Sequence, residues 1–266
     1  MSYQTIEIEK RAKGVAWIFI HNPPVNAINE PLMKDLEKAA MELTMDQTVR
    51  VVVVTSKHPK IFLAGADLKG MLQNNSDEEE ADNVIAKQCE RMQYCFHKFA
   101  TMPKPVLAAI NGHALGGGCE FALACDFRFM SKGRIGLTEV SLGIIPGAGG
   151  TQRMTRVLGR AKALEYIFTA KQLEKEEAEK VGLIHQSIEE EMFEQEVTKF
   201  AEQLADGAIH AMGLAKQAIN AAEDSTMEEG LRVEAHAFQD TFLSDEPAIG
   251  LAAFFQKEKP KFNLNE

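Results

Sequence analysis

The stretch Asn111-Gly112-His113-Ala114-Leu115-Gly116-Gly117-Gly118-Cys119-Glu120 joins a predicted strand to a predicted helix. The apolar run Val106–Ile110 before it is typical of a buried strand, and a helix is expected from about residue 119 to 124. The glycines at this junction allow the backbone to approach other groups closely. Glu120 follows three of them and precedes Phe121-Ala122-Leu123, so we expect its carboxylate to face a packed region.

Two further glycine-rich segments occur on either side of this stretch in the sequence. They are Ala64-Gly65-Ala66-Asp67 and Gly143–Thr151, and the second follows Glu139. The second segment lacks the Gly-Lys-Ser/Thr ending of a Walker A loop, and Gln152 stands where the dinucleotide fingerprint has Gly or Ala. These segments therefore do not indicate a nucleotide phosphate site. Taken singly they would be tight turns, but all three accompany suitable carboxylates.

The first part of the chain alternates short strands with helices, and the last part is helical. Strands are predicted at Thr5–Glu9, Gly14–Ile20, Arg50–Thr55, Val106–Ile110 and Asp126–Met130, with a helix at Glu30–Leu43. Helical patterns follow at Glu190–Leu204, Ile209–Ala222, Met227–Leu243 and Glu246–Phe255. We therefore expect an α/β core over residues 1–200, containing the active site, and a helical module over residues 201–266. The apolar helices of that module predict an oligomer.

Composition excludes several classes of protein. The formal net charge of −10 argues against binding to nucleic acid or to an anionic membrane, because no excess of basic residues is available to neutralise phosphates. Apolar runs such as Val51–Val54 are too short to span a bilayer, and no secretory signal is evident at the N-terminus. The four cysteines form no C-x-x-C pair, so reduced thiols and a cytoplasmic location are expected. Histidine spacing predicts no metal site.

Three segments together resemble the signature regions of the enoyl-CoA hydratase/isomerase (crotonase) superfamily. They are Phe62–Met71, Ala108–Asp126 and Gly136–Arg153, and the resemblance extends over nearly the whole chain. It implies an α/β fold built as a spiral of repeated ββα units, with a C-terminal helical trimerisation module. It also implies a homo-hexamer formed as a dimer of trimers.

The resemblance assigns chemical roles to five residues. The backbone N–H groups of Ala66 and Gly117 would form an oxyanion hole for the thioester carbonyl, where negative charge gathers when the α-carbon becomes enolate-like. Glu120 and Glu139 would hold one water and exchange the roles of acid and base. The N–H of Gly147 would help to hold that water.

The resemblance also implies contacts with the substrate and its coenzyme A. Those positions are Val25, Ala27, Ala64, Asp67, Leu68, Lys69, Phe254 and Lys257. Phe254 and Lys257 would reach the coenzyme of a neighbouring subunit. The segment Met71–Phe99 is expected to line part of the acyl pocket. Arg153 is expected to make a structural hydrogen bond or ion pair and to take no part in catalysis.

Both family glutamates are present, and this favours hydration of trans-2-enoyl-CoA to 3-hydroxyacyl-CoA in fatty-acid β-oxidation or related acyl-CoA catabolism. Isomerases of this kind typically use a single carboxylate. Two alternatives on the same fold are an enoyl-CoA isomerase and a hydratase for a branched or dicarboxylic substrate such as methylglutaconyl-CoA. A third, from another class, is an RNA-binding or scaffold protein, which the acidic charge disfavours. No cofactor is expected, because coenzyme A is part of the substrate.

Overall fold

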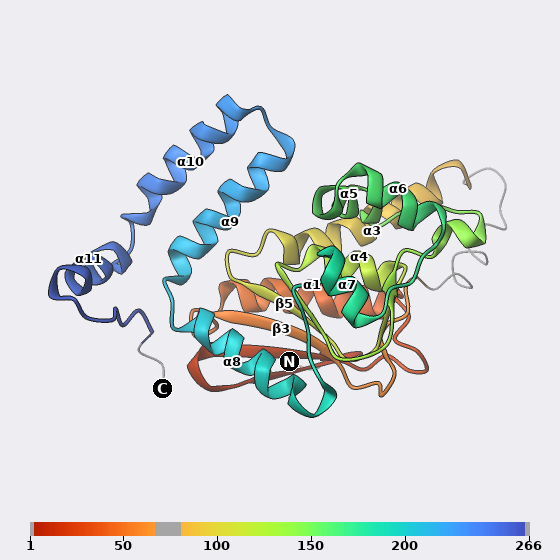
Figure 1. Cartoon of the computed structure of the whole chain (residues 1–266), viewed down its shortest axis with the longest axis horizontal. Helices are drawn as coiled ribbons and strands as arrows, with labels where there is room; N and C mark the ends of the chain where they lie inside the picture. The colour runs from red at the N-terminus through yellow and green to blue at the C-terminus, as the bar shows by residue number, and fades with distance from the viewer. Residues whose placement is uncertain (1–2, 67–80, 264–266) are drawn as a thin grey trace.

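The computed structural model describes residues 3–66 and 81–263 (Figure 1). Its strands are β1 Ile6–Lys10, β2 Val15–Ile20, β3 Val51–Ser56, β4 Ile61–Leu63, β5 Val106–Ile110, β6 His113–Leu115, β7 Phe127–Met130, β8 Ile135–Gly136 and β9 Gln186–Ser187. Its longer helices are α1 Glu30–Met45, α3 Ala81–Ala100, α8 Phe193–Ala205, α9 Ile209–Asp224, α10 Met227–Thr241 and α11 Glu246–Gln256. Its shorter helices are α4 Gly117–Ala124, α5 Gly150–Leu158, α6 Arg160–Phe168, α7 Lys175–Val181 and the 3-10 turns η1 Ala12–Gly14, η2 Glu139–Leu142 and η3 Glu190–Met192.

The described strands form two sheets. The larger has the order β1-β2-β3-β5-β7-β9, in which β1 pairs with β2 in antiparallel fashion and the remaining pairs are parallel. The smaller has the order β4-β6-β8 and is parallel. Each successive strand pair, β3–β4, β5–β6 and β7–β8, gives one strand to each sheet before the chain turns into a helix. The expected spiral of ββα units is therefore confirmed.

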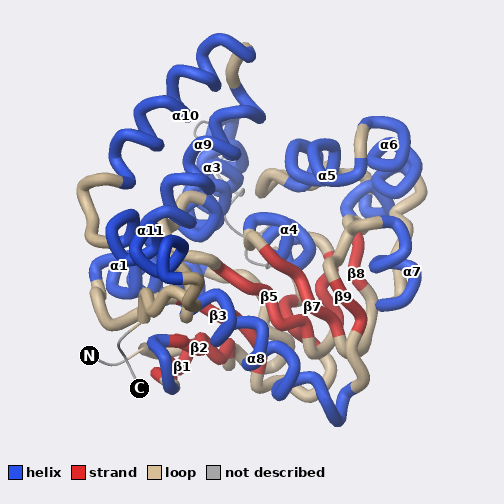
Figure 2. Tube along the Cα trace, turned by 60° about the vertical axis from the view of Figure 1, so that its left-hand side comes forward, coloured by secondary structure: helices blue, strands red, loops and turns tan. Residues whose placement is uncertain are grey.

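Helices cover both faces of the larger sheet (Figure 2). Val52 and Val54 of β3 point into the core beneath α1, α3 and α4, whereas Val51 and Val53 pack toward α8. This alternation explains why β3 is a continuous valine run, since a strand buried on both faces needs apolar side chains at every position. Helix α1 begins where the Asn29 side chain accepts a hydrogen bond from the Leu32 N–H. One face of the helix is buried, and its residues are Leu32, Met33, Leu36, Ala39, Ala40 and Leu43.

Helix α4 lies at the centre of the core, and all eight of its residues are buried. Its Phe121 ring packs edge-on against Phe96 and Phe99, with centroids 5.3 and 5.1 Å away, and lies 6.3 Å from the Phe62 ring. Burying an aromatic side chain of this kind contributes about 1.5–3 kcal/mol. Glu120 precedes Phe121 in α4, so it belongs to a helix whose residues are all buried.

The C-terminal helices α9, α10 and α11 extend away from the two sheets (Figure 1). Helix α8, by contrast, lies against the larger sheet, so the predicted boundary at residue 200 falls within a helix that belongs to the core. Among the described residues, no helix is long and apolar enough to cross a membrane.

Candidate active site

Glu120 enters the site from the first turns of α4, directly after the glycine cluster. A Cβ atom at Gly118 would lie 2.1 Å from the Leu63 carbonyl oxygen, so only glycine lets α4 approach β4 this closely. The approach brings Glu120 into the core, where 2% of the residue is exposed. The sequence prediction that this carboxylate faces a packed region is confirmed.

The Glu120 carboxylate is held by the loop that precedes α5. Its Oε1 accepts hydrogen bonds from the backbone N–H groups of Ala148, at 2.8 Å, and Gly150, at 2.7 Å. Arg153 Nη1 in turn donates to the Ala148 carbonyl oxygen at 3.0 Å. Arg153 therefore makes the structural hydrogen bond that was expected of it, and its effect is to fix the loop that fixes Glu120.

Glu139 stands at the start of η2, beside the same glycine cluster. Its Oε1 would lie 3.0 Å from a Cβ atom at Gly116. Its Oε2 is buried and has no hydrogen-bond partner among the described residues. A buried carboxylate oxygen without a partner is costly, and such groups are found where a ligand supplies the missing bond.

Burial is the largest contribution to the pKa shifts of both carboxyl groups. It raises the pKa of Glu120 to about 7, with a further upward contribution from the charge of Glu139. The Gly150 and Ala148 N–H groups and the Arg153 guanidinium act in the opposite direction on that pKa. Burial also raises the pKa of Glu139. The site can therefore retain a proton near neutral pH, which an acid–base pair requires.

Two backbone segments meet in front of these carboxylates. A Cβ atom at Gly117 would lie 3.2 Å from Gly65 Cα, so the turn holding Ala66 touches the first residue of α4. The N–H of a first helical residue has no partner within its own helix, and the helix dipole makes that position favourable for negative charge. The Ile28–Ala66 bridge fixes the facing segment. Gly117 therefore lies next to Gly65, the neighbour of Ala66 in the chain, and the role of the Ala66 and Gly117 N–H groups as an oxyanion hole stays a prediction.

The loop carrying Val25 and Ala27 lies against the turn carrying Ala64. Ala64 N–H donates to the Asn26 carbonyl oxygen at 3.3 Å, and the Asn26 side-chain amide donates to Ser56 Oγ at 2.7 Å and to the Phe62 carbonyl at 3.2 Å. Val25 of this loop and Ala64 of this turn are both exposed to solvent. Asn26 is fully buried, and its anchoring role was missed from the sequence, although its place after two prolines marks a fixed turn.

Five of the predicted substrate and coenzyme contacts lie outside the described residues or on the C-terminal helices. Asp67, Leu68 and Lys69 lie outside the described residues. Phe254 and Lys257 lie at the end of α11, on the part of the chain that extends away from the sheets (Figure 1). Phe254 is 75% exposed, so its side chain is free to meet another surface.

Gly147 contacts α3, which covers this side of the site. A Cβ atom at Gly147 would lie 2.8 Å from Cys89 Sγ, and Gln93 Nε2 donates to the Gly147 carbonyl at 2.7 Å. Met92 reaches Gly117 from the same helix, since its Cε would lie 3.3 Å from a Cβ atom there. The segment Met71–Phe99 was predicted to line the pocket, but the individual roles of Cys89 and Gln93 were not predicted.

Residues 10–265 match the family model described as enoyl-CoA hydratase/isomerase. The chain belongs to the enoyl-CoA hydratase/isomerase family. Among its relatives, a probable enoyl-CoA hydratase of Rhizobium meliloti is 36% identical over 98% of this chain and 99% of the relative. A short-chain-enoyl-CoA hydratase of Clostridium acetobutylicum is 34% identical over 97% of each chain.

Solved structures of the enoyl-CoA hydratase/isomerase family share this architecture. The structure of an enoyl-CoA hydratase from Bacillus anthracis superposes with a TM-score of 0.88 at 33% identity, over 98% of this chain and 99% of that chain. The similarity covers 98% of this chain, including the two sheets and the C-terminal helices. The fold expected from the three glycine-rich segments is therefore confirmed.

Proposed function

We propose that this chain catalyses the reversible hydration of trans-2-enoyl-CoA to 3-hydroxyacyl-CoA. The observation that carries the proposal is a pair of carboxyl groups beside Gly116–Gly118, of which Glu120 is buried and Glu139 is half-buried with one buried oxygen. Glu120 has a pKa near 7 and Glu139 has a buried oxygen without a partner among the described residues. Two such groups can hold one water molecule and divide the proton transfers between them.

In the forward direction, one glutamate removes a proton from water as its oxygen bonds to the β-carbon. The π electrons move toward the thioester carbonyl, where the N–H groups of Ala66 and Gly117 would stabilise the developing negative charge. One such donor is typically worth about 3–4 kcal/mol. The other glutamate gives a proton to the α-carbon, and the two roles are exchanged in dehydration. The N–H of Gly147 would help to hold the water.

The presence of both carboxyl groups favours hydration over isomerisation, which needs one group to move a proton between two carbons. The enzyme groups named in these steps are carboxylates and backbone N–H groups, and the proposed chemistry uses no separate cofactor. A relative named for short-chain substrates makes crotonyl-CoA the first substrate to test. Branched and dicarboxylic enoyl-CoA thioesters are the second candidates.

The proposal includes a cytoplasmic homo-hexamer, formed as a dimer of trimers, that binds the coenzyme A part of its substrate. Exposed aromatic residues support association through the C-terminal helices. They are Phe238 on α10, Phe242 directly after it, and Phe254 and Phe255 on α11. Val25, Ala27, Ala64, Asp67, Leu68 and Lys69 would contact substrate within one subunit. Phe254 and Lys257 would reach a neighbouring subunit's coenzyme.

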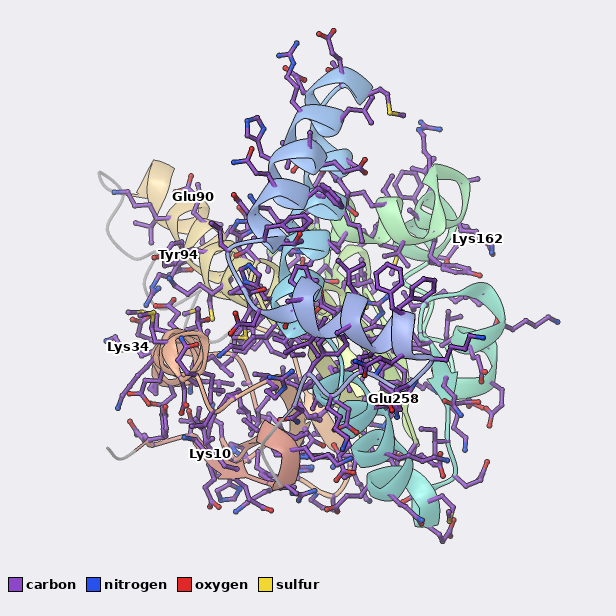
Figure 3. All side chains as sticks on the ribbon, turned by 90° about the vertical axis from the view of Figure 1, so that its left-hand side faces the viewer. Lys10, Lys34, Glu90, Tyr94, Lys162 and Glu258 are labelled. Atoms are coloured by element: carbon purple, nitrogen blue, oxygen red, sulfur yellow. The ribbon has the colours of Figure 1, made fainter. Side chains whose placement is uncertain are left out.

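The test is a panel of enoyl-CoA thioesters of varied length and branching, assayed with wild type, Glu120→Gln and Glu139→Gln. Either substitution removes a proton-transfer group without changing shape, so we expect turnover to fall about 10²–10⁴-fold. Binding of the thioester, followed by calorimetry, should persist. Glu90→Gln is a matched control, because Glu90 lies on the outer side of α3 (Figure 3). Near-normal hydration by either active-site variant would remove that glutamate from the mechanism.

A further inference from the structure

Two side chains of α3, one helical turn apart, contact the backbone of Gly147. Gln93 Nε2 donates to the Gly147 carbonyl oxygen at 2.7 Å. Cys89 lies four residues earlier, on the same face of the helix, and its Sγ occupies the space that a Gly147 Cβ would need. The first contact fixes the direction of the carbonyl, and the second keeps the backbone close to α3.

The Gly147 carbonyl belongs to the same planar peptide unit as the Ala148 N–H. That N–H donates to Glu120 Oε1 at 2.8 Å. Because the unit is rigid, turning the carbonyl away from Gln93 would also turn the N–H away from Glu120. Arg153 fixes the following peptide through the Ala148 carbonyl, so the loop is held on both sides.

We infer that Gln93 is a positioning residue, which orients the Glu120 carboxylate through the Gly147–Ala148 peptide. The contact itself is independent of the reaction, but its catalytic consequence rests on the proposed function. Among the described residues, Gln93 makes no hydrogen bond to either carboxylate, and Gln93 is exposed to solvent. Water can replace part of its effect, so the consequence of removing it is moderate.

The other groups that face Glu120 come from four elements. Glu139 of η2 raises its pKa, Arg153 of α5 lowers it, and the Cys89 and Cys119 thiols lie within electrostatic range on α3 and α4. Replacing Gln93 with methionine changes none of these charges. A change in the titration of Glu120 would therefore report on the orientation of the peptide.

The experiment compares Gln93→Met, which is neutral and similar in length, with Gln93→Glu, which keeps the shape but cannot donate when ionised. Gln203→Met is the control, because Gln203 is exposed on α8. The Glu120 pKa is measured by carbon-13 NMR of labelled glutamate, with the signal assigned by its loss in Glu120→Gln. The values kcat and KM are measured with crotonyl-CoA.

We expect Gln93→Met to raise the Glu120 pKa by several tenths of a unit, because a weakened Ala148 N–H bond stabilises the charged form less. The net value of one hydrogen bond predicts a fall in kcat of about 2- to 10-fold, with KM almost unchanged. Gln93→Glu should be more defective than Gln93→Met. A Glu variant that behaves like wild type, or a Met variant with unchanged pKa and kcat, would overturn the inference. Wild type without hydratase activity would instead count against the proposed function, while the pKa comparison would still test the contact.

Discussion

Burial and backbone donors act in opposite directions on the Glu120 carboxyl. Burial and the Glu139 charge favour the neutral form, whereas the Ala148 and Gly150 N–H groups favour the anion. The result is a pKa near 7 in the folded protein, compared with 4.5 for an ordinary glutamate. A pKa raised by folding means that the folded state binds the proton more tightly than the unfolded state.

This linkage predicts how stability depends on pH. The stability contributed by the protonated Glu120 is fully present below the unfolded pKa of 4.5 and is lost as pH rises through about 7. The loss is about 3 kcal/mol. Glu120→Gln cannot titrate at this position and should lack this loss. Between pH 4.5 and pH 8 we therefore expect the free energy of unfolding of wild type to fall relative to that of Glu120→Gln. Urea unfolding at several pH values measures it, and parallel curves for the two proteins would contradict the expectation.

The contact between Gly147 and Cys89 gives a second prediction at this scale. Gly147→Ala places a methyl group 2.8 Å from Cys89 Sγ, so the loop or α3 must shift. We expect a loss of about 1–3 kcal/mol in stability, together with reduced hydratase turnover. Cys89→Ala removes the opposing sulfur. The double variant Gly147→Ala, Cys89→Ala should therefore regain most of the lost stability and most of the lost turnover. Cys89→Ala alone serves as the control, and a double variant no better than Gly147→Ala would show that the clash is not the cause.

The structure places Glu139 beside Gly116 and Glu120 beside Gly150, and the glycine-rich segments near both were recognisable in the sequence; the catalytic roles of the two glutamates stay predictions. The sequence was not sufficient to predict Asn26 or Gln93 as supports. Their partners, Ser56, Phe62 and Gly147, are distant in the chain, and no local pattern marks a polar side chain that will meet a particular carbonyl oxygen.

At the scale of elements, helix α9 is tied to the core by a partly buried ion pair. Lys216 Nζ lies 2.8 Å from Asp126 Oδ2 and also donates to the Phe99 carbonyl at 3.2 Å. The same Asp126 oxygen accepts the Val106 N–H at 2.8 Å. One carboxylate thus joins α9 to the start of β5, the strand that precedes the glycine-rich stretch in the chain.

We expect Lys216→Met to destabilise the protein by about 1–3 kcal/mol, because it leaves the Asp126 carboxylate partly buried without its cation. The double variant Lys216→Met, Asp126→Asn should lose less than the sum of the single losses. Urea unfolding provides the measurement. Lys199→Met is the control, since Lys199 is 76% exposed in its pair with Glu196 and such surface pairs contribute little. Strict additivity in the double variant would argue against a coupled pair.

Long elements could be predicted from the sequence and very short ones could not. The apolar spacing of α1 and the valine run of β3 are strong local signals, and both elements were predicted within two residues. The strands β4, β6 and β8 have only two or three residues each and were not predicted separately. They form because the spiral brings the segments together, which depends on pairing across many residues and not on local propensity.

At the scale of the whole molecule, the C-terminal helices carry much of the exposed apolar surface. Phe238 and Phe242 of this region pack edge-on against each other, with centroids 5.6 Å apart, yet Phe238 is 68% exposed and Leu243 is 82% exposed. An apolar cluster of this kind on helices that extend away from the sheets is suited to contact with other subunits.

We therefore expect Phe238→Asp combined with Leu243→Asp to shift the protein toward smaller species, because two charges would have to be buried on assembly. Sedimentation velocity gives the distribution of species, and circular dichroism verifies that the chain remains folded. Met45→Asp is the control, since Met45 is equally open to solvent but lies on α1. An unchanged sedimentation coefficient for the double variant would place the subunit contact elsewhere.

The close approach of Gly118 to Leu63 has a consequence for how such a protein can diverge. No side chain can be introduced at Gly118 without displacing β4, so this position should tolerate no replacement in a saturation mutagenesis library, whichever substrate is used for selection. Helix α3 is less restricted, because residues such as Met92 contact the site through the far end of a flexible side chain, which can be exchanged without moving the backbone. Natural or laboratory selection for a new substrate is therefore expected to accumulate its changes on α3, while the turns that carry the reacting groups are inherited intact.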